Sequence, residues 1–214
     1  MKGPMRMARL DILTMKPQYA AYLSLVFMVL LFGFMGSSLV LLCITGAWFA
    51  ALMIATVFVI QEKNGLERLY GSVSLRLRDM VRGRYLFVLL NYAVSIAAVM
   101  LMACAFSLFR GEKIMLTDAA LGLGLSFLVF AAITGIQLPL YFRLGYAKAK
   151  LWSMVPFVAV LGLLIIPQIA VALVDVPQTA LMHPGAMTII CLLLGCAVML
   201  VSCRISEAAS RRRR

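Results

Sequence analysis

The chain carries very little charge for its length. Of its 214 residues only 28 are charged, whereas 64% are hydrophobic and the mean hydropathy is +1.03. Soluble domains carry about a quarter charged residues, so this composition excludes a water-soluble globular protein. Because an unpaired backbone amide in hydrocarbon costs several kcal/mol, the spanning segments must be helical. The sequence therefore predicts an all-α integral membrane protein.

Residues that catalyse reactions or bind metals are also scarce. There is one histidine, His183, and the five cysteines form no C-x-x-C pair, which argues against a metal site and favours a packing role for the cysteines. The motifs H-E-x-x-H and G-x-S-x-G are absent, and no Gly-Lys dipeptide occurs, so a phosphate-binding P-loop is excluded. We expect no enzyme and no cofactor or metal in this chain; if ATP drives it, another protein hydrolyses the ATP.

Long uncharged runs define the expected spans. The 45 residues of 17–61 contain no charge and would extend about 68 Å as one helix, roughly twice a ~30 Å hydrocarbon core. The run must therefore fold back, and the glycines and serines of 33–38 mark the turn. None of the six expected spans contains a charge, which argues against a proton-coupled transporter or a voltage sensor. The spans are residues 19–35, 39–60, 86–109, 119–142, 151–174 and 185–203.

The distribution of Lys and Arg predicts the orientation. Eighteen of the 20 basic residues lie in four segments, 1–18, 61–85, 143–150 and 204–214, which six spans would place on one side. Short basic segments resist translocation, so this side and both termini are expected to be cytoplasmic. The net charge of +12 then reflects topology and contact with anionic lipids, and no nucleic-acid partner is expected.

The chain divides into three parts: residues 1–18, the six-span domain 19–203, and a basic cytoplasmic tail, 204–214. The first part is too polar to span and has a pattern typical of an interfacial amphipathic helix, although a disordered basic tail is the alternative. Its expected apolar stripe consists of Met5, Ala8, Ile12, Met15 and Tyr19, flanked by Arg6, Arg9 and Lys16. Long basic side chains beside such a stripe extend to lipid headgroups.

A few residues inside the spans carry specific expectations. Asn91, Gln137 and Gln168 are interpreted as interhelical hydrogen-bonding residues rather than substrate ligands. Pro156 and Pro167 lie eleven residues apart, on nearly one face of the fifth span, and each removes a backbone hydrogen bond. They are candidate gating kinks, with a static kink as the alternative.

Residues 61–85 contain nine of the 28 charged residues. Their apolar side chains recur every three or four residues, which predicts two short amphipathic helices separated near Gly71, with Ser74 as a candidate cap for the second. The stripe consists of Leu66, Leu69, Tyr70, Val73, Leu77, Met80 and Val81. An amphipathic pair outside the bilayer must bury this stripe against the membrane surface or in a groove of another protein, and both remain open on physical grounds.

Two stretches carry a family resemblance. The first is Glu62-Lys63-Asn64-Gly65, followed by Leu69, Ser72 and Val73, then Arg78-Asp79-Met80-Val81 and Arg84-Tyr85-Leu86; the second runs from Leu138 to Lys150. Together with the N-terminal helix, they resemble ABC type-2 permeases, the membrane subunits of ATP-binding cassette exporters. Leu66 and Ser74 depart from that pattern, where an aromatic residue and a proline are frequent.

The resemblance implies a permease subunit in a bacterial plasma membrane, working as a dimer with a second copy or a paralogue. A separate cassette ATPase would bind ATP and Mg and dock on the 61–85 segment. The implied cargo is an amphipathic or hydrophobic compound such as an antimicrobial peptide, a lipid or a drug. The implied ATPase-coupling residues are Glu62, Gly65, Leu66, Leu69, Tyr70, Ser72, Val73, Leu77, Arg78, Asp79, Met80 and Val81.

Three alternatives remain. A substrate-capturing subunit of an energy-coupling importer also has about six spans but lacks such a basic loop. A membrane-embedded enzyme would need His, Asp or Glu at membrane depth, where this sequence has none. A non-transporting adaptor would use the loop for docking alone.

Overall fold

The computed structural model describes residues 3–15, 20, 22–64, 77–111, 114–163 and 184–212. Every regular element in these ranges is helical, which confirms the all-α prediction for this part of the chain. The elements are α1 (Gly3–Met15), α2 (Tyr22–Phe34), α3 (Leu39–Lys63), α5 (Leu77–Arg110), α6 (Leu116–Leu144), α7 (Tyr146–Ala149), the 3-10 turn η2 (Trp152–Met154) and α9 (Pro184–Arg212).

Four of these helices, α3, α5, α6 and α9, are long and apolar enough to cross a membrane. Two shorter apolar helices, α2 and Trp152–Leu163, stand where the first and fifth spans were expected. At ~1.5 Å per residue the 13 residues of α2 rise about 20 Å, less than a ~30 Å hydrocarbon core. The described residues thus contain four candidate spans where the sequence predicted six.

The expected turn between the first two apolar helices is confirmed. Helix α2 ends at Phe34, Gly36 adopts a φ of +80°, and the Ser38 hydroxyl accepts a hydrogen bond from the Leu41 amide at 3.4 Å. A positive φ is accessible to glycine because it lacks a Cβ, and a serine before the first helical residue satisfies a free amide of α3. The 45-residue uncharged run therefore folds back on itself.

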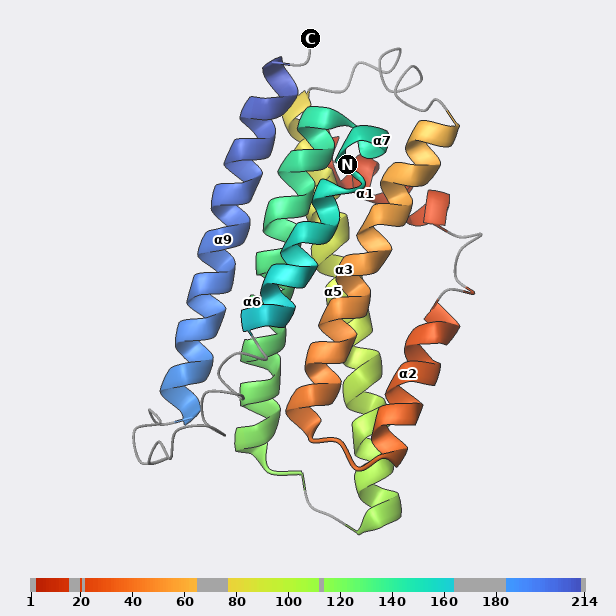
Figure 1. The fold of residues 1–214 in the computed structure, drawn as a ribbon, viewed down its shortest axis with the longest axis vertical. Helices are drawn as coiled ribbons and strands as arrows, with labels where there is room; N and C mark the ends of the chain where they lie inside the picture. Colours follow the sequence, from red (N-terminus) through yellow and green to blue (C-terminus); the bar gives the residue numbers. More distant parts are fainter. Residues whose placement is uncertain are drawn as a thin grey trace.

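Small residues bring α6 close to its neighbours. A Cβ added at Gly124 would lie 3.1 Å from the Thr188 backbone of α9, and one at Gly122 would lie 3.1 Å from the Cys43 sulfur of α3. Gly195 faces Phe127, where an added Cβ would lie 2.7 Å from the ring. These glycines serve contacts within the chain, with α6 packed along both α9 and α3 (Figure 1).

Two of the three expected interhelical hydrogen-bonding residues are confirmed. The Asn91 amide donates to the Ala50 carbonyl at 3.1 Å, which joins α5 to α3, and accepts from the Tyr22 hydroxyl of α2. Gln137 of α6 donates to the Ser153 carbonyl at 3.2 Å. Gln168 lies outside the described residues.

The basic segments converge at one end of the bundle. Helix α1, the end of α3, the start of α5, α7 and the C-terminal end of α9 all lie there (Figure 1). Residues 77–85 are helical, as expected for the second short helix of the 61–85 segment, but they form the first turns of α5 and are not a separate helix. Residues 204–212 of the expected tail continue α9. Described parts of all four basic segments therefore lie together at this end.

Candidate functional site

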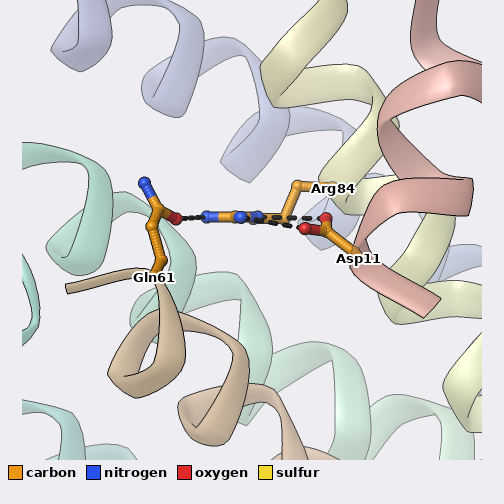
Figure 2. Close-up of polar contacts among 3 residues, drawn as sticks. All are labelled: Asp11, Gln61 and Arg84. Atoms are coloured by element: carbon orange, nitrogen blue, oxygen red, sulfur yellow. Dashed lines mark hydrogen bonds and ion pairs between the residues drawn. The ribbon is translucent and has the colours of Figure 1, made fainter. Parts of the chain in front are cut away.

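A buried ion pair lies at the end of the bundle that carries the basic segments (Figure 2). Arg84 of α5 donates to both carboxylate oxygens of Asp11 in α1, with nitrogen–oxygen distances of 3.0 and 3.3 Å. A third nitrogen donates to the Gln61 amide oxygen of α3 at 2.5 Å. The Arg84 and Asp11 side chains are only 2% and 1% exposed. One guanidinium therefore joins three helices.

The surroundings of Arg84 compensate for its burial. Its guanidinium carbon lies 4.5 Å from the centre of the Phe58 ring, a cation–π contact, and its forked hydrogen bonds match a carboxylate. A buried charge is tolerated only when it is paired and hydrogen-bonded. The cluster therefore fixes α1 and the end of α3 against the start of α5.

This cluster was not predicted. Asp11 carried no expectation, although it is the one carboxylate of residues 1–18 and lies one turn from Ala8 on the helix. Arg84 was expected only as a basic residue of the 61–85 segment and part of the family resemblance, and Gln61 only as the end of the uncharged run. An acidic residue next to an apolar helical stripe was the signal available.

The helical conformation expected for the first segment is confirmed by α1. Of its expected apolar stripe, Met5 and Ile12 are exposed and Ala8 is packed inside the chain, beside the buried Met7 and Asp11. The reason is that α1 packs on α5 through the Asp11 face. The exposed apolar residues are left on a neighbouring face of α1, which suits an interfacial helix.

Gly83 allows α1 to approach α5. An added Cβ at Gly83 would lie 2.6 Å from both the Met7 Cβ and the Pro4 carbonyl oxygen of α1. Real Cβ atoms essentially never come this close to backbone or Cβ atoms, so a larger residue would push α1 away.

We therefore expect Gly83→Ala to loosen α1 and to weaken the Asp11–Arg84 pair. Overpacking of this kind typically costs about 1–3 kcal/mol. The measurement is thermal unfolding of the purified chain in detergent, with Gly185→Ala as the control because a Cβ there meets nothing within 4 Å. Equal unfolding temperatures for the two variants would contradict the close approach of α1.

A second polar contact joins α3 to the turn after α6. The Glu62 carboxylate accepts a hydrogen bond from the Ala147 amide at 3.1 Å, within the first turn of α7. Gly145, with a φ of +77°, makes the sharp turn between α6 and α7. A carboxylate at a free helix amide acts as a cap, so Glu62 fixes α7 beside the end of α3.

Helix α9 is tied to α5 at the same end. Arg82 pairs with Glu207 at 2.8 Å, and the Tyr85 hydroxyl lies 2.5 Å from the Ser202 hydroxyl and 2.9 Å from that of Ser206. Arg82 is largely exposed, so its pair adds little stability, whereas the Tyr85 contacts are buried. Helices α1, α3, α5, α7 and α9 are thus connected by polar side chains near the 61–85 segment.

The structure describes only part of the predicted coupling set. Arg78 is exposed and Asp79 and Met80 are half-buried on the first turns of α5. Leu77 begins α5, but its side chain lies outside the description, as do the residues expected to form the first half of the loop. These are Gly65, Leu66, Leu69, Tyr70, Ser72 and Val73, together with Ser74.

One predicted coupling residue points elsewhere. Val81 has an exposed fraction of 0% and belongs to the hydrophobic core of the chain. Its side chain is therefore committed to internal packing, and the expectation that it anchors a partner is corrected. Of the two candidate kink residues, Pro156 is buried in the Trp152–Leu163 helix and Pro167 lies outside the described residues.

In the part of the chain that the structure describes, no group of His, Cys, Asp or Glu side chains is arranged to hold a metal ion. The five cysteines are free thiols, two of them buried. This end of the molecule carries a set of helix ends joined by polar side chains.

A comparison with protein-family models places the sequence in a known family. The family model described as ABC-2 family transporter protein matches residues 7–207, nearly the whole chain. The chain belongs to the ABC-2 transporter family. No curated protein and no solved structure matches it.

Membership of the ABC-2 family and the apolar helices together identify a multi-pass membrane permease. The resemblance drawn from residues 62–86 and 138–150 is thereby confirmed at the level of the family. Members of this family are membrane components of transporters and are generally not catalytic themselves, and an ABC ATPase is their general kind of partner.

Proposed function

We propose that this ABC-2 permease forms the translocation path of an exporter in the bacterial plasma membrane and is driven by a separate ATPase. Both termini and the 61–85 segment lie on the cytoplasmic side, and the working unit contains two permease chains. The ATPase binds ATP and Mg and docks on the 61–85 segment, where the exposed Arg78 and the half-buried Met80 contribute to the contact.

The observation that carries this proposal is the bridge across the base of the docking segment. Gln61 at the end of α3 and Arg84 near the start of α5 are hydrogen-bonded to each other, and Arg84 is also bound to α1. Force applied to the residues between them therefore moves α1, α3 and α5 together. Glu62 extends the same connection to α7.

The proposed cargo is an amphipathic or hydrophobic compound. In the four long helices the charged residues lie near the ends, leaving the middle of α3, α5, α6 and α9 without charge. An uncharged path offers no partner to compensate for the hydration that an ion loses on entering it, whereas it suits an apolar compound. Antimicrobial peptides, lipids and drugs are the classes to be tested.

A reconstitution experiment tests the transport function. The permease and its ATPase are placed in liposomes, and ATP hydrolysis is measured with and without hydrophobic dyes, amphipathic peptides and lipids. An exporter predicts that at least one class stimulates hydrolysis and accumulates inside vesicles in which the ATPase faces the bath. A non-transporting adaptor predicts ATPase binding with neither effect.

Glu62 provides a specific test of coupling. Glu62→Ala removes the acceptor of the Ala147 amide, and we expect the permease-dependent part of ATP hydrolysis to fall about fivefold, the factor that corresponds to about 1 kcal/mol. ATPase binding should remain. The control is Lys63→Ala, an exposed neighbour; an equal loss in both variants would contradict a role for the α3–α7 contact.

A further inference from the structure

A groove of about 450 Å³ lies between α1, α2 and α5 and is called here the α1–α2–α5 groove. Its wall is almost entirely apolar and includes Ile12 of α1, Leu25 and Val26 of α2, and Phe87, Val94 and Ala98 of α5. Val26 and Val94 are also exposed on the outer surface of the bundle. The groove therefore opens toward whatever surrounds the helices.

The dimensions of the groove match one leaflet of a membrane. Phe87 and Ala98 are eleven residues apart on α5, about 16 Å at ~1.5 Å per residue, and half of a ~30 Å hydrocarbon core is about 15 Å. Helix α5 is one of the candidate spans. Three polar residues also line the groove, but Tyr22 and Asn91 are hydrogen-bonded to each other and the Ser95 hydroxyl is buried. The groove therefore offers water few hydrogen-bonding partners, and in a bilayer hydrocarbon chains fill it.

The charge at the α1 end favours an anionic headgroup. Arg9 lies one turn before Ile12, is exposed, and forms no ion pair within the described part of the chain. The only carboxylate of residues 1–18, Asp11, is already bound by Arg84. Helix α1 therefore presents, one turn from the groove wall at Ile12, a positive charge that its own acidic residue does not neutralise, and anionic headgroups are attracted to such a charge.

We infer that the α1–α2–α5 groove is a lipid site that takes one acyl chain of an anionic phospholipid, with the headgroup held beside Arg9. The site is distinct from the 61–85 docking segment and does not depend on ATPase binding. Its lipid would fill the space between α2 and α5 below α1, and so would support the position of α1 that the Asp11–Arg84 pair fixes.

Filling the groove with a larger side chain tests whether a lipid acyl chain binds there. The chain is purified in mild detergent with equal amounts of phosphatidylglycerol and phosphatidylcholine, and retained lipid is counted by native mass spectrometry. We expect about one phosphatidylglycerol per wild-type chain and at least a fivefold loss in Val94→Trp. The matched control is Leu101→Trp, seven residues further on α5 and 72% exposed against 63% for Val94, but outside the groove wall.

Val26→Trp fills the same groove from α2, so lipid retention can still be measured on a groove-filling variant if Val94→Trp does not fold. Equal lipid retention in the groove-filling variants and Leu101→Trp would overturn the site. The ATPase-binding assay on the same variants separates this outcome from a failure of the proposed transport function, because neither valine belongs to the docking segment.

Replacing the Arg9 side chain tests whether the site prefers an anionic headgroup. Arg9→Gln should keep a bound lipid but reduce the preference for phosphatidylglycerol over phosphatidylcholine at least threefold. Arg143→Gln removes an exposed cation from the end of α6 and should leave the preference unchanged. The same preference in both variants would overturn the assignment of an anionic headgroup.

Discussion

Asp11→Ala is expected to destabilise the folded permease by about 3–5 kcal/mol, because removing one partner of a buried ion pair leaves the other charge uncompensated. Arg84 would keep only Gln61 and the Phe58 ring while remaining buried. Helix α1 would lose the ion pair that anchors it to α5. The effect can be measured as a lowered midpoint of thermal or denaturant unfolding in detergent, together with faster proteolysis within α1.

The matched control is Asp118→Ala, which removes an exposed carboxylate from the first turn of α6 and should change stability by less than about 0.5 kcal/mol. The double variant Asp11→Ala with Arg84→Met should be more stable than Asp11→Ala alone, since it also removes the unpaired charge. A double variant that is less stable than Asp11→Ala would contradict the view that Arg84 is a buried, uncompensated charge once Asp11 is removed.

Met80→Asp is expected to release the ATPase while the permease still inserts in the membrane. Met80 lies half-buried on the first turns of α5, at the end of the proposed docking segment. Apolar anchors at the centre of an interface typically contribute at least about 2 kcal/mol, so ATPase binding should weaken about 30-fold. Leu77→Asp, at the first residue of α5, should have the same effect.

Binding is measured by co-purification of a tagged permease with its ATPase at several salt concentrations. The control is Ile205→Asp, which places the same charge on an exposed apolar position of α9 outside the docking segment. ATPase retained by both Met80→Asp and Leu77→Asp would refute docking at this segment. Loss of the ATPase from Ile205→Asp alone would show that the ATPase contacts α9 and not the 61–85 segment.

Much of the fold follows from local sequence signals. The reversal at 33–38 was predictable because an uncharged run longer than a bilayer must turn where glycines weaken the helix, and the structure places the end of α2 and the start of α3 there. The continuation of α9 beyond residue 203 into the expected tail was not predictable in the same way, because hydropathy marks where a segment leaves the apolar core but not where its helix ends.

The site was harder to predict than the fold because its contacts join distant segments. Asp11 and Arg84 are 73 residues apart, and nothing local to either residue identifies the other. The recurrence of apolar residues every three or four positions assigned Met80 and Val81 to one stripe, whereas Met80 is half-buried and Val81 is buried. Val81 is buried because α5 continues as one helix into the bundle, so its first turns share the core of the chain.

The most direct test of the account is to purify the tagged chain from its native cells in mild detergent and to identify co-purifying proteins by mass spectrometry. The account predicts a near-stoichiometric soluble protein with a phosphate-binding P-loop, lost in Met80→Asp and kept in Ile205→Asp. An intact, monodisperse permease without such a partner would contradict ATPase-driven transport.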